Sequence, residues 1–140
     1  MSTAPLVLTP RETVLVSRCL MGVLCRYHGE RYRFGRDLTR DHGIVRRLRA
    51  RGCDIVAVCP EVDAGLPVPR PPTRWVGERL ICDGIDVTAT FVRGGQMAVD
   101  TARRCGAVRA YLLHGSPSCD RDRGIAARLL AAAGVTIIRV

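Results

Sequence analysis

The sequence predicts an α/β domain in which helices cover both faces of a mostly parallel, Rossmann-like sheet. Three observations indicate this fold class. Short apolar runs alternate with segments of helical periodicity, which is typical of right-handed βαβ crossovers. The apolar runs are nearly continuous, as expected for strands that are covered on both faces. A length of 140 residues also suits one domain, so we expect a single three-layer sandwich over residues 1–140.

The first half of the chain contains two predicted strands and one helix. Residues 1–11 hold two prolines and small polar side chains, and predict a loose lead-in. Residues 12–17 form an apolar, β-branched run that predicts the first strand, and a long loop rich in Gly, Arg and Tyr follows over 18–35. An apolar stripe predicts a helix over 41–52, and the next apolar run predicts a strand over Asp54–Val58.

Five prolines dominate the segment after the second strand. Because proline breaks helices and interior strands, residues 60–72 are predicted to be neither and to run extended over the surface. A strand or short hairpin over 75–81 and a turn over 84–88 should lead into a helix over 90–105, capped by Asp86 or Thr88. The residues predicted to be buried in that helix are Phe91, Met97, Ala98 and Ala102. The last elements are a strand, a helix and a strand over residues 108–113, 125–133 and 136–140.

Composition restricts the compartment and the partners. No apolar run is long enough for a transmembrane helix and the N-terminus lacks a secretion signal, so we expect a cytoplasmic protein without a membrane partner. The net charge of +9 comes with arginine and no lysine, a choice that a GC-rich genome favours. This charge would attract RNA or another anionic ligand. The arginines are dispersed, without a basic tail, so nucleic-acid binding is an alternative and not the main prediction.

The cysteines do not follow a disulfide or zinc-finger pattern. Their number is seven, which is odd, and there is no Cys-x-x-Cys or His-x-x-x-His spacing. Cys53, Cys82 and Cys105 are interpreted as small packed hydrophobes. Cys25 shares the first long loop with Cys19 and could be a ligand, a spare thiol or a packed residue.

Cys19, Cys59 and Cys119 each follow a predicted strand. In a parallel sheet these positions meet at the carboxyl edge, where ligands bind in such folds. Three thiolates with an open fourth position suit zinc with a water, or an iron–sulfur cluster with one free iron. Thiolates without a nearby histidine favour the iron–sulfur cluster. The other interpretation is three buried or redox-active thiols.

Four sequence motifs occur in order and together resemble a known family. They are VSRCLMG with CRYHG (16–22 and 25–29), CPEV with GLPVPRPP (59–62 and 65–72), GIDVT (84–88) and SPSC (116–119). The set resembles a bacterial family of domains of unknown function that includes thiouracil desulfidase. The resemblance covers residues 14–135, which is essentially the whole predicted domain.

The resemblance implies non-redox desulfuration of a thiolated nucleobase such as 2-thiouracil, with release of sulfide from an oxygen-sensitive [4Fe-4S] cluster. Carried over by position, the cluster ligands are Cys19, Cys59 and Cys119. The implied catalytic residues are Glu61, which would take a proton from water, and Ser116, which would hydrogen-bond the base or the intermediate. The residues predicted to bind or orient the substrate are Arg26, Arg70 and Ser118.

The chain departs from the family pattern in loops around the predicted site. His28, Thr73-Arg74 and Asp120 stand where the family usually has Asp, Ala-Glu and Gly. A changed rim leaves open another thiolated base or a different small sulfur compound as the substrate. Two other function classes also stay open: a non-catalytic sensor domain that binds a metal or a cluster, and an RNA-associated protein that acts on thiolated tRNA.

Overall fold

A four-stranded parallel sheet forms the centre of the molecule. The computed structural model describes residues 11–23, 25, 27 and 43–140. The sheet consists of β1 (Thr13–Ser17), β2 (Asp54–Val58), β6 (Arg109–Leu112) and β7 (Thr136–Arg139), in the order β2-β1-β6-β7. The prediction of a mostly parallel sheet is therefore confirmed, with each strand within one or two residues of its predicted range.

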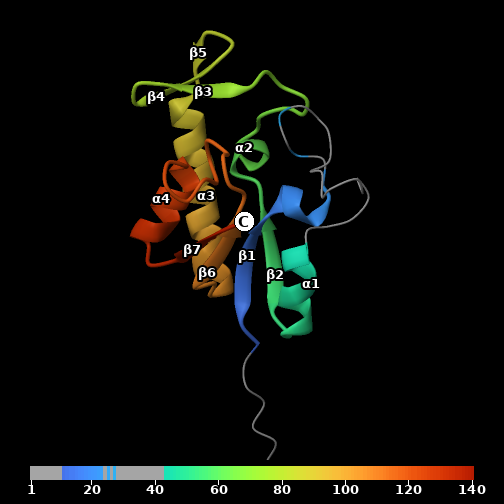
Figure 1. The fold of residues 1–140 in the computed structure, drawn as a ribbon. Helices are drawn as coiled ribbons and strands as arrows, with labels where there is room; N and C mark the ends of the chain where they lie inside the picture. The colour runs from blue at the N-terminus through green and yellow to red at the C-terminus, as the bar shows by residue number, and fades with distance from the viewer. Residues whose placement is uncertain (1–10, 24, 26, 28–42) are drawn as a thin grey trace, which may run out of the picture.

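Helices cover the sheet on both sides. Helix α1 (Gly43–Ala50) lies beside β2, and α3 (Thr88–Cys105) and α4 (Ile125–Ala132) lie together on the other side (Figure 1). This arrangement confirms the predicted layers of helix, sheet and helix. None of the described helices is both long and apolar enough to cross a membrane.

A second, antiparallel sheet stands at the N-terminal end of α3 (Figure 1). It contains β3 (Thr73–Val76), β4 (Arg79–Cys82) and β5 (Ile85–Asp86) in sequence order. The first two strands form the expected hairpin. The third strand occupies part of the predicted turn over 84–88, because Ile85 and Asp86 pair with β4 before α3 begins.

The start of α3 lies two residues earlier than predicted. Neither predicted cap takes the N-cap position, which belongs to Val87, but the Asp86 carboxylate accepts the backbone N–H of Thr88 at 2.9 Å. The buried face was predicted correctly for three of four residues. Met97 is 40% exposed and was wrongly predicted to be buried. It neighbours the buried Ala98 in sequence, and one residue rotates a helix by about 100°, which turns Met97 toward solvent.

The prediction that residues 60–72 contain no helix is also wrong. Residues Pro60–Asp63 form the one-turn helix α2, with Pro60 in its first turn. A proline there lacks only an N–H that would have no helical partner anyway. The predicted long loop likewise starts with a short 3₁₀ helix, η1 (Arg18–Met21). Arg18 Nη2 donates to Asp63 Oδ1 at 2.9 Å, so the two short helices hold each other in place.

The strand order creates a topological switch point between β1 and β6. The chain leaves β1 toward β2 on one side, whereas it leaves β6 toward β7 on the other side. In open α/β sheets the crevice for ligands lies outside the carboxyl ends of such strands. Val14, Leu15 and Val16 of the central strand β1 are fully buried and give this crevice a rigid base.

Helix α3 approaches α2 so closely that only glycine fits at the contact. A Cβ atom on Gly94 would lie 2.1 Å from the carbonyl oxygen of Pro60. Because Pro60 stands between Cys59 and Glu61, this contact also sets the position of two predicted site residues.

We expect the substitution Gly94→Ala to lower the free energy of unfolding by about 1–3 kcal/mol, because the added methyl group overpacks this contact. Gly43→Ala is the matched control, since a Cβ atom there meets nothing within 4 Å. Urea unfolding of both variants measures the difference. Equal free energies of unfolding for the two variants would contradict this prediction, because α2 and α3 would then accommodate the methyl group without loss of stability.

Candidate active site lined by four thiols

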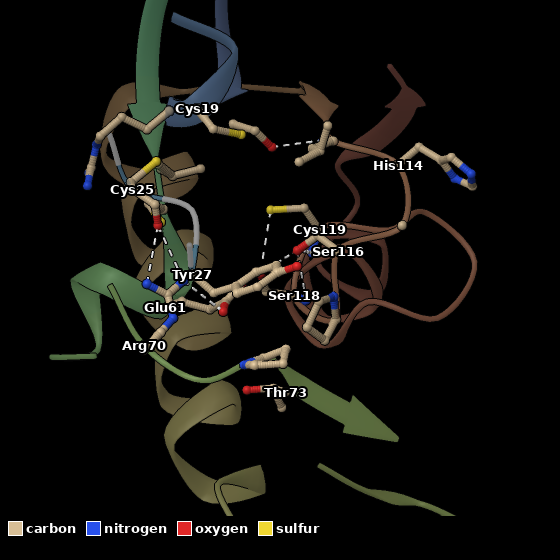
Figure 2. A pocket seen from close by; sticks show the side chains of 18 residues that line it. Cys19, Cys25, Tyr27, Glu61, Arg70, Thr73, His114, Ser116, Ser118 and Cys119 are labelled. Carbon is tan, nitrogen blue, oxygen red and sulfur yellow. Dashed lines mark hydrogen bonds and ion pairs between the residues drawn. The ribbon is translucent and has the colours of Figure 1, made fainter. Parts of the chain in front are cut away.

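A cavity of about 400 Å³ opens at the carboxyl ends of β1, β2 and β6. Cys19, Cys59 and Cys119 all line it, together with Cys25 (Figure 2). The three thiols that follow the three strands therefore converge as the sequence predicts. In the part of the chain that the structure describes, no three Cys, His, Asp or Glu side chains are grouped closely enough to hold one metal ion. The thiols instead stand around the cavity wall.

Each of the three thiols reaches the cavity from a different local structure. Cys19 lies in η1, two residues beyond β1, and is buried. Cys59 directly follows β2 and is the N-cap of α2, with its backbone N–H donated to Asp63 Oδ2 at 3.2 Å. Cys119 lies in the turn after β6 and is buried. The Arg18–Asp63 ion pair thus connects the segments that carry Cys19 and Cys59.

Cys25 is a fourth, buried thiol beside two of the others. A hydrogen bond with Cys19 is the foremost cause that raises the pKa of Cys25, to about 12, whereas its bond with Cys59 lowers this pKa. The pKa of Cys59 is raised far above its ordinary value, foremost by the hydrogen bond with Cys25 and then by burial. The structure thus excludes a remote packed position for Cys25, because its side chain belongs to the cavity wall.

Two serine hydroxyl groups form hydrogen bonds with the Cys119 thiol. Burial raises the pKa of Cys119 to about 11, while hydrogen bonds with Ser17 and Ser118 lower it. Ser17, at the end of β1, accepts the N–H of Leu113 at 2.9 Å and is 2% exposed. Ser17 was not among the residues predicted to act at the site; a hydroxyl at the end of an apolar strand, two residues before a site cysteine, is the signal that could have identified it.

A chain of hydrogen bonds joins the predicted catalytic and substrate-binding residues. Glu61 accepts from Arg70 Nη2 through Oε1 and from the Ser118 hydroxyl through Oε2, both at 2.9 Å. The Ser116 and Ser118 hydroxyl oxygens lie 3.0 Å apart. Because the Ser118 proton goes to Glu61, Ser116 is the donor of this bond. Ser118, and not Ser116, is therefore the direct neighbour of Glu61.

Arg70 uses its guanidinium group to hold protein segments. Nη1 donates to the carbonyl oxygens of Pro67 at 3.0 Å and Cys25 at 3.3 Å, and the backbone N–H donates to the carbonyl of Tyr27 at 2.6 Å. The Arg70 side chain is 4% exposed and Nε has no hydrogen-bond partner among the described residues. Arg26, the other arginine predicted to bind or orient the substrate, lies outside the described residues, as does His28.

The turn over residues 116–119 is held by its own side chains. The Ser116 oxygen accepts the N–H groups of Ser118 at 3.2 Å and Cys119 at 3.1 Å. The carboxylate of Asp120 turns back into its loop, where it accepts the N–H of Gly115 and contacts His114 Nδ1, both at 2.9 Å. These contacts, led by the Gly115 N–H, lower the pKa of Asp120.

The residues that depart from the family pattern differ in whether they line the cavity. Asp120 is not among the cavity-lining residues, whereas Thr73 is. The change at Asp120 therefore stabilises a loop, and the change at Thr73 alters the cavity wall itself.

Comparison with known proteins identifies the family. The chain matches the 2-thiouracil desulfurase family over residues 14–139. The chain belongs to this family. The family resemblance inferred from the four motifs is therefore confirmed.

Two individual proteins are similar to this member of the 2-thiouracil desulfurase family over most of its length. One is a solved structure described as a [4Fe-4S]-dependent thiouracil desulfidase, TudS. It is 33% identical, with a TM-score of 0.78, and the match covers 92% of this chain and 91% of that one. The other is the uncharacterized protein YbbK of Bacillus subtilis (strain 168), 27% identical over 152 residues, which are 89% of this chain and 93% of YbbK.

The raised thiol pKa values predict a loss of stability at high pH in the reduced, metal-free protein. Cys119 titrates at about 11 when folded, against an ordinary value of 9.0. Above pH 9 the folded state therefore binds more protons than the unfolded state. The stabilisation that comes from the Cys119 thiol is complete below pH 9 and is lost as the pH rises toward 11. Between about pH 8 and pH 10.5, we expect the wild type to lose roughly 2 kcal/mol more than Cys119→Ala. Urea unfolding at the two pH values measures this, and equal losses would contradict it.

Proposed function

We propose that this protein removes sulfur from a thiolated pyrimidine such as 2-thiouracil by hydrolysis, with a [4Fe-4S] cluster bound at Cys19, Cys59 and Cys119. Water supplies the oxygen that replaces sulfur, and the products are the oxo base and hydrogen sulfide. One observation carries the proposal: three thiols from three strand ends share a single cavity with a positioned carboxylate. The family and the similarity to a [4Fe-4S]-dependent thiouracil desulfidase support it.

The donor set fits an iron–sulfur cluster. Such clusters are held by cysteine thiolates, and each thiolate binds a different iron, so the ligands stand around a wide space and not around one ion. Cys19 and Cys119 are buried in the wall of the cavity, where with Cys59 they would hold the cluster. When bound through three thiolates, the cluster supplies a free iron that attracts sulfur and draws charge from the carbon–sulfur bond.

The protein residues handle the proton and the orientation of the substrate. Arg70 and Ser118 each hold one oxygen of Glu61, so the carboxylate points in a fixed direction before substrate enters. The Glu61 side chain is 12% exposed and lines the cavity, where it can take a proton from the attacking water. Ser116 also lines the cavity, and its hydroxyl would bond the oxygen that forms on the base by turning its proton from the Ser118 oxygen toward the substrate.

A sensor function accounts for fewer of these features. A site that only detects a cluster needs ligands, but it does not need a carboxylate held on both oxygens at the cavity wall. The chain Arg70–Glu61–Ser118–Ser116 is therefore the observation that favours an enzyme over the sensor.

The ligand assignment predicts a sharp difference between two cysteine variants. After anaerobic reconstitution, wild type and Cys105→Ser should be coloured and contain about four irons per chain, whereas Cys59→Ser should lose most of the iron. Cys105 is the control because it lies at the end of α3 and does not line the cavity. Iron analysis and visible absorption measure the outcome. Zinc-only, colourless wild-type protein, or iron retained by both variants, would refute the assignment.

The reaction is tested by anaerobic sulfide release from 2-thiouracil, its nucleoside and thiolated tRNA. We expect the wild type to release sulfide from the free base, and Glu61→Gln to keep its iron but to lose roughly 10²–10⁴-fold in rate, because it lacks the base. Glu78→Gln, on the exposed turn between β3 and β4, is the control and should keep full activity. Sulfide release from thiolated tRNA alone would identify thiolated tRNA, and not the free base, as the substrate. A full cluster with no release from any compound would favour the sensor.

A further inference from the structure

Ser17 carries a buried hydroxyl group at the cavity wall to which the proposed reaction gives no role. It is the last residue of β1, lines the cavity and is 2% exposed. Its side-chain oxygen accepts the backbone N–H of Leu113 at 2.9 Å, which holds the hydroxyl group at the carboxyl end of the sheet. Because Leu113 leads into the turn that carries Cys119, this bond joins β1 to the segment of the third predicted cluster ligand.

The hydroxyl proton of Ser17 is available to the Cys119 sulfur. A hydroxyl group has one proton to donate and two lone pairs that accept, and the N–H of Leu113 uses only a lone pair. Among the described residues the Ser17 hydroxyl has no oxygen or nitrogen acceptor, but it forms a hydrogen bond with Cys119. A buried hydroxyl proton without an acceptor is costly, so we expect it to point at the sulfur.

The neighbouring serines have already used their protons. The Ser118 oxygen lies 3.7 Å from the Cys119 sulfur (Figure 2), but the Ser118 proton goes to Glu61. Ser118 can therefore only accept from the thiol, and it donates nothing to a sulfur that has lost its proton. The proton of Ser116 goes in turn to Ser118. Of the three described serines that line the cavity, Ser17 alone can donate to the sulfur of Cys119.

We propose that Ser17 is a positioning residue for the iron–sulfur cluster, whose hydroxyl group donates a hydrogen bond to the sulfur of Cys119 and withdraws charge from it. The inference rests on the proposed function, since it needs Cys119 as a cluster ligand. Hydrogen bonds to the ligand sulfurs raise the reduction potential of such a cluster, because they stabilise the added negative charge. They also leave less negative charge on the iron, which strengthens its attraction for the sulfur of the substrate.

The surroundings of the other thiols make this bond distinctive. Cys119 is 6% exposed, and burial raises the pKa of its thiol to about 11, while the bond with Ser17 lowers this pKa. The bond therefore favours the thiolate, which is the form that binds iron. Cys59 has the thiol of Cys25 as its neighbour instead, and a thiol is a weaker donor than a hydroxyl group.

The test compares the reduction potential of the cluster among variants after anaerobic reconstitution. Ser17→Ala should keep about four irons per chain, but its equilibrium constant for reduction should fall roughly 3- to 30-fold, because the bond to the sulfur is lost. A tenfold fall corresponds to about 59 mV for a one-electron couple. Ser17→Thr keeps the hydroxyl group and should stay within about twofold of the wild type. A redox titration monitored by EPR measures these values.

Two further variants separate hydrogen-bond donation from packing. Ser118→Ala is the matched control, because it removes the other hydroxyl group near Cys119 and should change the equilibrium constant by less than about twofold. Ser17→Val has nearly the shape of Ser17→Thr without the hydroxyl group, and its potential should resemble that of Ser17→Ala. This second pair tests the donation even if Ser17→Ala, which leaves the Leu113 N–H without its acceptor, does not fold.

Equal potentials in Ser17→Val and Ser17→Thr, or a shift in Ser118→Ala as large as that in Ser17→Ala, would overturn the proposal. Wild-type protein that holds no cluster would overturn it together with the proposed function. A full cluster whose potential depends on the Ser17 hydroxyl group, but which releases no sulfide from any thiolated compound, would refute the proposed reaction and leave the role of Ser17 standing.

Discussion

The buried ion pair between Arg70 and Glu61 is the interaction on which the site depends. The side chains are 4% and 12% exposed, and their charged atoms are 2.9 Å apart. A buried charge is stable only when it is paired and its remaining polar atoms are bonded. Arg70 also donates hydrogen bonds to the carbonyl oxygens of Cys25 and Pro67, and Glu61 also accepts one from the Ser118 hydroxyl. One charge pair therefore holds together three segments that are distant in sequence, those around Cys25, residues 61–70 and Ser118.

The parallel sheet supplies the second constraint. Since parallel strands end at one edge, three cysteines separated by tens of residues meet around one cavity. The hydrogen bond with Cys19, and then burial, raises the pKa of Cys25 to about 12, and burial raises the pKa of Cys119 to about 11. Neutral thiols are thus the stable form of the metal-free site, and a metal group must displace these protons when it binds. Ser17 offsets part of this cost at Cys119, because the hydrogen bond with its hydroxyl group lowers the pKa of that thiol.

Local signals were sufficient for most of the fold. The strands of the parallel sheet could be found because doubly covered strands are continuous apolar runs, and β2 was predicted with both bounds correct. The errors arose where tertiary contacts override local rules. Helix α2 forms in a proline-rich segment because Asp63 and the packing of Gly94 on Pro60 stabilise one turn. The Asp120 carboxylate accepts hydrogen bonds within its own loop, next to Cys119, and no local pattern in the sequence indicates these contacts.

The sequence by itself determined the succession along the chain of the parallel strands and the longer helices, the family, and the position of three cysteines at strand ends, because apolar periodicity and short motifs are local properties of a chain. Only the tertiary structure decided which side chains touch. It placed Ser118 and not Ser116 against Glu61, bound Arg70 to the carbonyl of Cys25, and brought Ser17 to Cys119. These pairs are 45 to 102 positions apart or depend on the rotation of a turn by one residue, and no pattern along the chain specifies such geometry.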